Sequence, residues 1–142
     1  MDYVLDTNTL IQYLRDEPNV LQNFDDAVTN KCNFIIPKAV DYELRRGFGI
    51  HPAKKKEAVY TIFIQQCTIG ELDFGVWDYA MEVYIELYKK RFTVGEMDIL
   101  IGAFCLAHDY TLVTSNIKDF INIDGIKLVD WTQPQYGGTF CV

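Results

Sequence analysis

The chain has 142 residues, 49% of them hydrophobic and 14% aromatic, and a formal net charge of −7, which fits one globular domain with a substantial core. This negative net charge argues against a basic protein that coats nucleic acid through its overall electrostatic field. No apolar run reaches the roughly 20 residues that cross a bilayer and the N-terminus lacks signal-peptide features, so we expect a cytoplasmic protein with no membrane partner.

Apolar runs bounded by turn residues alternate with helical patterns, which predicts a βαβ-type domain. Strands are expected at residues 3–5, 34–36, 111–114 and 126–129, with a weaker one at 67–72. Helices are expected at residues 9–15, 20–28, 38–48, 52–66, 76–91 and 97–108. Pro and Gly residues follow the last strand, so we expect a domain at 1–131 and a C-terminal tail at 132–142.

Two predicted helices have unusual apolar patterns. The helix at 76–91 carries a broad stripe of apolar residues, which is either core or a subunit interface. The stripe consists of Trp77, Ala80, Met81, Tyr84, Leu87 and Tyr88. From Ile99 to Ala107 the sequence is apolar on every side, which predicts a buried central helix.

Two of the predicted strands run into polar residues at their carboxyl ends. Asp6 ends the first strand, and Thr114 and Asn116 follow Val113, with Asp119 three residues later. In open parallel sheets, ligands bind beyond the carboxyl ends of the strands, where the connections diverge to opposite faces. We therefore expect these polar groups to meet at one edge of the sheet.

Glu43 is a carboxylate on an apolar helix face. Helical spacing places it beside three apolar or small residues, Val40, Leu44 and Gly47. Asp41 lies on the other side, where it can pair with Arg45 four residues on, so we expect Asp41 to be an ordinary surface residue. A carboxylate on an apolar face must be hydrogen-bonded, paired or metal-bound, which makes Glu43 a candidate functional residue.

Asp98 heads the most apolar helix of the chain. Thr93 and Glu96 fit a capping box, which would start the helix before Asp98 and leave this carboxylate without a capping role. If the helix begins later, Asp98 itself favours the positive end of the helix dipole. The functional interpretation is favoured when Asp98 is taken together with the other acids.

Several carboxylates in one place cannot all stay ionised without compensation, because repulsion and desolvation raise their pKa values. Oxygen ligands without a cysteine or histidine cluster favour Mg²⁺ or Mn²⁺ over zinc. A hard cation among carboxylates predicts metal-dependent hydrolysis of phosphodiesters.

The cysteines form no CxxC pair and no CxxC…HxxxH pattern. We therefore expect free thiols at Cys32, Cys67, Cys105 and Cys141.

Five segments together carry a family pattern: Val-Leu-Asp-Thr-Asn at 4–8, Glu-Leu-Arg at 43–45, Gly-Glu-Met-Asp-Ile-Leu-Ile-Gly-Ala at 95–103, Leu-Val-Thr-Ser-Asn-Ile-Lys-Asp-Phe at 112–120 and Val-Asp-Trp at 129–131. Over about residues 2–131 the chain resembles PIN-domain ribonucleases of the VapC toxin type, and the combination is far more specific than any one segment. The resemblance implies a three-layer α/β/α PIN-like fold with a central parallel sheet of four to five strands. It also implies a metal-dependent endoribonuclease that is the toxin of a type II toxin–antitoxin system.

The resemblance also assigns roles by position. Asp6 and Asp98 match the family's principal metal ligands and Glu43 its third acid, while Thr114 matches the small hydroxyl residue of the fourth motif. Many relatives have aspartate at the position of Asn116. Asp119 could supply the missing carboxylate, or it could be a surface residue or the cap of a short turn at 117–120. The number of metal ions, one or two, therefore stays open.

The family further implies an RNA substrate, a homodimer, and a small antitoxin whose tail occupies the active-site groove. Two runs of basic residues close in sequence to Glu43 are candidates to contact the RNA phosphates. They are Arg45, Arg46, Lys54, Lys55 and Lys56.

Other functions fit the sequence less well. A nuclease that processes stable RNA would use the same chemistry without an antitoxin. A catalytically silent PIN module would bind RNA or protein, and Asn116 would be a sign of decay, but Asp6, Glu43 and Asp98 together count against it. A phosphatase of the haloacid-dehalogenase type needs a second aspartate where this chain has Asn8. A receiver domain needs a paired acid before the strand-end aspartate, which is not clear here.

Overall fold

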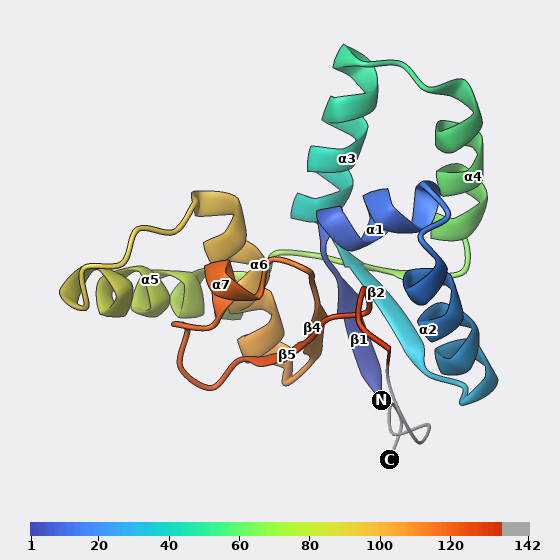
Figure 1. Ribbon diagram of the computed structural model, residues 1–142. Helices are drawn as coiled ribbons and strands as arrows, with labels where there is room; N and C mark the ends of the chain where they lie inside the picture. The colour runs from blue at the N-terminus through green and yellow to red at the C-terminus, as the bar shows by residue number, and fades with distance from the viewer. Residues whose placement is uncertain (135–142) are drawn as a thin grey trace.

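The computed structural model describes residues 1–134, which form a five-stranded parallel sheet with helices on both faces (Figure 1). The strands run in the spatial order β3-β2-β1-β4-β5. Their bounds are β1 (Asp2–Leu5), β2 (Asn33–Pro37), β3 (Thr68–Gly70), β4 (Thr111–Val113) and β5 (Lys127–Val129). The predicted three-layer α/β/α fold and all five predicted strands are confirmed.

Seven helices join the strands within the described residues. They are α1 (Thr7–Leu14), α2 (Pro18–Thr29), α3 (Lys38–Ile50), α4 (Lys54–Ile64), α5 (Phe74–Lys89), α6 (Glu96–His108) and α7 (Ile117–Phe120). The six predicted helices are confirmed, with ends that differ by no more than two residues. The seventh, α7, lies where the sequence indicated a short turn.

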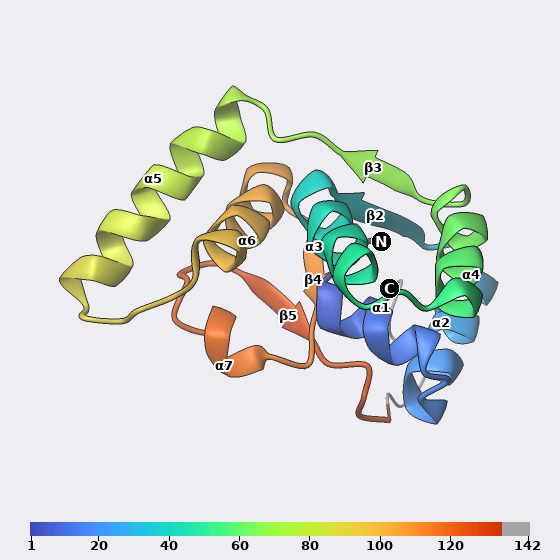
Figure 2. The ribbon, with the colours of Figure 1, turned by 90° about the horizontal axis from the view of Figure 1, so that it is seen from above.

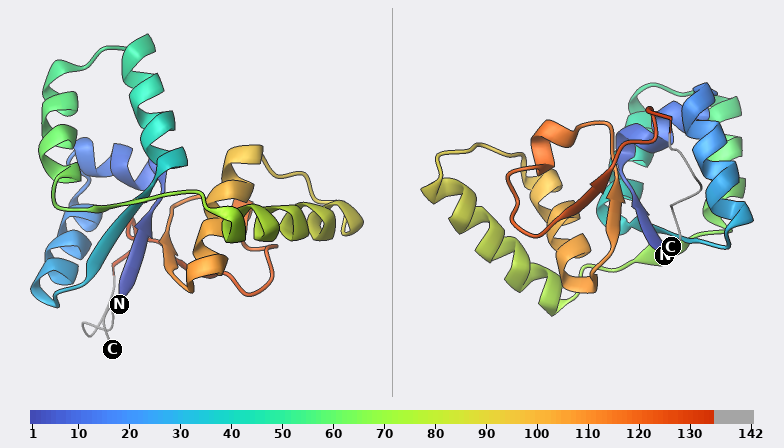
Figure 3. Two further views of the ribbon diagram at one scale, coloured as in Figure 1. Left: turned by 180° about the vertical axis from the view of Figure 1, so that it is seen from behind. Right: turned by 60° about the horizontal axis from the view of Figure 1, so that its bottom comes forward.

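The order of the connections divides the helices between the two faces of the sheet. From β1 the chain moves outward through β2 to β3, and it then returns to the other side of β1 as β4 and β5. Helices α1, α2 and α4 cover one face and α5 and α6 the other, with α7 packed beside α6 (Figures 2 and 3). The direction reverses between β1 and β4, where Leu5 is paired with Val113. This is the switch point at which open parallel sheets bind ligands.

Helix α6 is the buried central helix that its sequence predicts. Ile101, Ala103 and Cys105 are among its fully buried residues. At Gly102 an added Cβ would come within 2.8 Å of Ile123 Cδ1, so the glycine lets α6 approach the segment that follows α7. This close packing holds the middle of α6 against the segment between α7 and β5.

The C-terminal part of the described chain is held against α2. Trp131 is 1% exposed and packs edge-on against Phe24, with 4.9 Å between the ring centroids. Asn19 Nδ2 donates to the backbone oxygen of Thr132 at 2.8 Å. The predicted tail therefore begins as an anchored segment, and residues 135–142 lie outside the described part of the chain.

Two expectations drawn from composition can also be compared with the structure. Cys67 and Cys105 are free, as expected, but Cys32 is disulfide-bonded, so that prediction was wrong; Cys141 lies outside the described residues. Within residues 1–134, no helix combines the length and the apolar character that crossing a bilayer requires.

Candidate active site

Asp6 lies at the carboxyl end of β1, where it caps the N-terminus of α1. Its side chain is held by three donors, since Oδ1 accepts from the backbone N of Thr7 at 2.8 Å, and Oδ2 accepts from Thr114 Oγ1 at 2.8 Å and from Asn8 Nδ2 at 3.0 Å. Burial raises the pKa of Asp6, the hydrogen bonds from Thr114 and Thr7 oppose that rise, and the nearby Glu43 adds to it. The carboxylate is thus fixed in one orientation and partly compensated.

The two residues after Asp6 join three elements of the site, although the sequence analysis did not name them as site residues. Thr7 Oγ1 donates to Glu43 Oε1 at 3.0 Å, which ties α1 to α3. Asn8 Oδ1 accepts from the backbone N of Ser115 at 3.2 Å, which ties α1 to the loop after β4. The sequence carries the signal, because an acid, a hydroxyl and an amide follow one another at a strand end, but only the acid was assigned a role.

Glu43 was predicted to be a site residue and Asp41 a surface residue, and the structure agrees only for Glu43. Glu43 is half-buried beside Thr7, which supports its assignment to the site. Asp41 was expected at the surface, yet it is 8% exposed and accepts from Tyr60 Oη at 2.7 Å. Its pairing with Arg45 is confirmed at 3.7 Å. The apolar face of α3 is wider than spacing from Val40 and Leu44 suggested, because α4 packs near the Asp41 side.

Asp98 lies in the first turn of α6. The helix begins at Glu96 with Gly95 as its N-cap and no side-chain capping bond, so the predicted capping box of Thr93 and Glu96 is wrong. Burial and, after it, the charges of Asp6, Asp119 and Glu43 in that order together raise the pKa of Asp98 to about 6. Acids from four separate stretches of the chain therefore lie close enough to repel one another.

The segment after β4 supplies both a structural hydroxyl and a carboxylate. Thr114 is fully buried, and besides donating to Asp6 it accepts from the backbone N of Asn116 at 3.0 Å. The side chain of Asn116 is exposed and makes no capping bond to α7. Asp119 is half-buried in α7 and acts on Asp98. The geometry thus favours Asp119 over Asn116 as the fourth acid of the cluster.

The fit of a metal ion to this cluster is partial. Among residues 1–134, no three Asp, Glu, His or Cys side chains form a ready-made ligand set, so direct ligation by Asp6, Glu43 and Asp98 together is not built into the structure. The donor chemistry nevertheless suits a hard cation, because the cluster is all oxygen and its repulsion is uncompensated at Asp98. Mg²⁺ usually keeps several waters and binds one or two carboxylates, which this arrangement allows.

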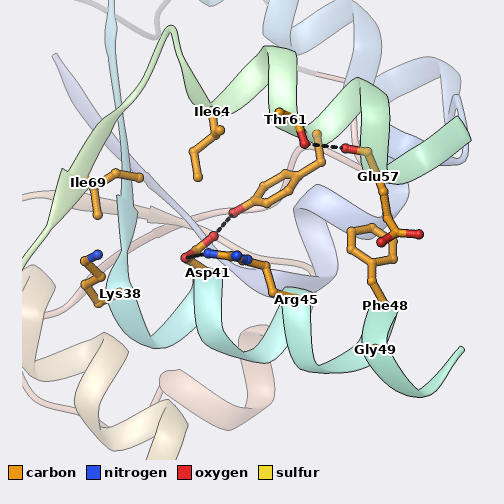
Figure 4. A pocket seen from close by; sticks show the side chains of 10 residues that line it. Lys38, Asp41, Arg45, Phe48, Gly49, Glu57, Thr61, Ile64 and Ile69 are labelled. Atoms are coloured by element: carbon orange, nitrogen blue, oxygen red, sulfur yellow. Dashed lines mark hydrogen bonds and ion pairs between the residues drawn. The ribbon is translucent and has the colours of Figure 1, made fainter. Parts of the chain in front are cut away.

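The predicted phosphate contacts divide into two groups. Arg45 lies on the opposite side of α3 from Glu43, where it pairs with Asp41 at the wall of a cavity of about 620 Å³ between α3, α4 and β3 (Figure 4). Arg45 was expected near the acidic cluster, and the structure places it away from that cluster. All of these candidates are exposed, Arg45 included. Arg46 lies over the ring of Tyr42 with 5.0 Å to the centroid, and Lys54–Lys56 form the first turn of α4.

The comparisons with known proteins agree on one family. The family model for the PIN domain matches residues 3–126, a range that contains the four acids. The chain is 31% identical to ribonuclease VapC2 of Rickettsia felis over 134 residues, which cover 92% of this chain and 98% of that protein. It is 26% identical to the tRNA(fMet)-specific endonuclease VapC of Salmonella typhimurium over 133 residues, again 92% of this chain and 98% of the relative.

Solved structures with a similar fold come from the same group of proteins as the sequence relatives. A crystal structure of VapBC2 from Rickettsia felis, bound to a DNA fragment from their promoter, contains a chain that superposes with a TM-score of 0.85 at 28% identity. The superposition covers 92% of this chain and 99% of the other. The similarity therefore extends along nearly the whole of both chains.

Proposed function

This chain belongs to the PIN domain family, and we propose that it is an endoribonuclease of the VapC type that acts as the toxin of a toxin–antitoxin pair. The observation that carries the proposal is the effect of three distant acids on Asp98, whose pKa they raise together with burial. Proteins rarely gather carboxylates that destabilise one another unless the site has a function. The cluster also lies at the switch point of the sheet, where binding sites are expected.

The proposal includes Mg²⁺ or Mn²⁺. Asp6 and Asp98 are the residues that would hold the ion, with Glu43 and Asp119 close by. A bound divalent ion would supply charge neutralisation and an activated water for phosphodiester hydrolysis. The chain's own contribution is to hold Asp6 in one orientation, through Thr114 and its neighbours, and to present a second carboxylate, Asp98, on the first turn of α6.

The substrate of this activity would be a structured or single-stranded RNA. Arg46 and Lys54–Lys56 are exposed and can contact phosphates, whereas Arg45, although exposed, pairs with Asp41 on the side of α3 away from Glu43. A small basic surface on an acidic protein suits recognition of one RNA by its shape rather than binding to all RNA. Because one relative is named a tRNA(fMet)-specific endonuclease, initiator tRNA is the first substrate to try.

The remaining parts of the proposal concern assembly. We expect a small antitoxin protein whose tail enters the groove beside the acids, a homodimer, and action in the cytoplasm. The names of structural relatives support the antitoxin, since the superposed Rickettsia felis structure is of VapBC2. A small gene immediately upstream would separate a toxin from an RNA-processing nuclease with the same chemistry.

The direct test is cleavage of RNA by the purified chain with Mg²⁺, followed by mapping of the new 5′ ends. Asp98→Asn should abolish cleavage, because it removes one of the two acids assigned to the ion. Glu96→Gln is the matched control, since Glu96 is an exposed carboxylate in the same helical turn, and it should cleave like the wild type. Identical 5′ ends with wild type and Asp98→Asn would refute the catalytic assignment. Protection from unfolding by Mg²⁺ without any cleavage would instead favour a silent binding module.

A further inference from the structure

Two side-chain amides on α1 hold one residue of the loop that follows β4. Asn8 and Gln12 are four residues apart and therefore lie on the same face of the helix. Asn8 Oδ1 accepts from the backbone N of Ser115 at 3.2 Å, and Gln12 Nε2 donates to Ser115 Oγ at 3.2 Å. Ser115 is thus held through its main chain and through its side chain. We call Asn8 and Gln12 the α1 amide pair.

The loop that begins at Ser115 leads directly to one acid of the site. Thr114 Oγ1 accepts from the backbone N of Asn116 at 3.0 Å, and the backbone oxygen of Asn116 accepts from the backbone N of Asp119 at 3.0 Å. Short hydrogen-bonded turns therefore connect Ser115 to Asp119. Because the charge of Asp119 acts on Asp98, a movement of this loop would change the spacing of two acids in the cluster.

The two ends of this loop are fixed by packing, while its middle is exposed. At one end, Thr114 is fully buried and its backbone N donates to the oxygen of Val129 at 3.0 Å. At the other end, Phe120 is fully buried where α7 packs beside α6. Between them the side chains of Asn116 and Lys118 are exposed. The α1 amide pair therefore restrains the part of the loop that core packing does not hold.

The stability of the fold does not account for Gln12. Its Oε1 is buried and has no hydrogen-bond partner among the described residues. A buried acceptor without a partner costs as much free energy as one ordinary hydrogen bond contributes, or more. An apolar side chain of the same shape should therefore be at least as stable at this position. Side chains that break such a rule of stability are expected at functional sites.

We infer that Gln12 is a positioning residue for Asp119. The α1 amide pair holds Ser115, and the loop that follows keeps Asp119 beside Asp98. This inference rests on the proposed function and adds one residue to it. Gln12 bonds to Ser115 and acts on a divalent ion only through the placement of the acids. Since residues that orient the groups around a metal commonly contribute ten- to hundredfold to its affinity, and Gln12 acts from further away, we expect about tenfold.

The test compares Gln12→Met with the wild type in Mn²⁺ binding, RNA cleavage and stability. Methionine has the length and the unbranched shape of glutamine without the amide. The dissociation constant for Mn²⁺, measured by electron paramagnetic resonance, should rise about tenfold, and kcat should fall with little change in KM. The midpoint of urea unfolding should equal or exceed that of the wild type, because the unpaired Oε1 is gone. A variant that is less stable yet binds Mn²⁺ like the wild type would overturn the inference.

A control and a double variant show whether Gln12 acts through Ser115. Gln22→Met is the matched control, since Gln22 is an exposed glutamine on α2 whose amide donates to Asp26 at 3.0 Å, and it should bind Mn²⁺ like the wild type. Ser115→Ala should lose as much affinity as Gln12→Met, and the double variant should lose no more than either. Additive losses would mean that the two residues act independently, which contradicts the inference.

Amide hydrogen exchange separates a failure of this inference from a failure of the proposed function, because it needs no metal. In Gln12→Met the backbone amides of Asn116 and Asp119 should exchange faster than in the wild type, while those of β4 should not change. Unchanged exchange at both residues would refute the positioning role. Faster exchange in a protein whose wild type neither binds Mn²⁺ nor cleaves RNA would support the restraint of the loop and refute the proposed function.

Discussion

Replacing Asp98 with asparagine should stabilise the protein at neutral pH in the absence of divalent cations. Burial and three neighbouring acids raise the pKa of Asp98 from 3.8 to about 6. The folded state therefore holds the proton more tightly than the unfolded state. Below about pH 4 both states are protonated and the group has no effect on stability. As the pH rises from about 4 to about 6, the folded state loses stability relative to the unfolded state, and above this range the loss is complete.

The size of this effect follows from the shift. At about 1.36 kcal/mol per pKa unit, ionising Asp98 in the folded protein costs no more than about 3 kcal/mol. The side chain is only half-buried, so solvent screening reduces the expected cost to about 1–2 kcal/mol. Asp98→Asn keeps the shape of the side chain without the charge, and its free energy of unfolding should exceed that of the wild type by this amount at pH 7.

The assay is urea unfolding of wild type and Asp98→Asn from pH 4 to pH 8 in the presence of EDTA. The difference between the two proteins should vanish near pH 4 and reach its full value above pH 6. Glu96→Gln, an exposed carboxylate in the same turn, should show no such pH-dependent gain. Parallel stability profiles for wild type and Asp98→Asn across this range would refute the idea that the acids act on one another.

Two further substitutions test the packing around the site, each by urea unfolding. Tyr60→Phe removes the 2.7 Å hydrogen bond to the buried carboxylate of Asp41 and should cost about 1.5–3 kcal/mol; a change near zero would mean that Arg45 alone compensates Asp41. Gly70→Ala places a Cβ against the buried ring of Phe104 and should cost about 1–3 kcal/mol. Gly47→Ala, in an open stretch of α3 with nothing near the new Cβ, should instead gain about 0.5–1 kcal/mol, and equal effects of the two glycine substitutions would contradict the packing.

The fold could be predicted from the sequence because its signals are local and agree with each other. Short apolar runs alternate with helical periods, and the apolar run from Ile99 to Ala107 can only be a buried helix. Chain order then determines which strands lie together at the switch point. Asp6 and Thr114 were identified for this reason, since both follow directly on a strand whose end the pattern fixes.

The errors concern contacts that no local pattern encodes. Asp41 is buried because Tyr60, nineteen residues later on α4, donates to it, and helical spacing within α3 carries no information about α4. Arg45 is an exception, because it lies two residues from Glu43 on α3 and helical spacing alone puts it on the other side of the helix. The capping box predicted at Thr93 and Glu96 was wrong, because α6 begins at Glu96 with Gly95 as its N-cap. The contacts of Thr7 and Asn8 were not predicted, because their partners come from α3 and from the loop after β4.

The acids of the site are not equally compensated, and this difference indicates where a cation would act. Asp6 accepts three hydrogen bonds, from Thr7, Asn8 and Thr114, which oppose the effect of its burial. For Asp98, burial and the charges of its neighbours all raise the pKa. A positive charge would therefore change the protonation of Asp98 more than that of Asp6.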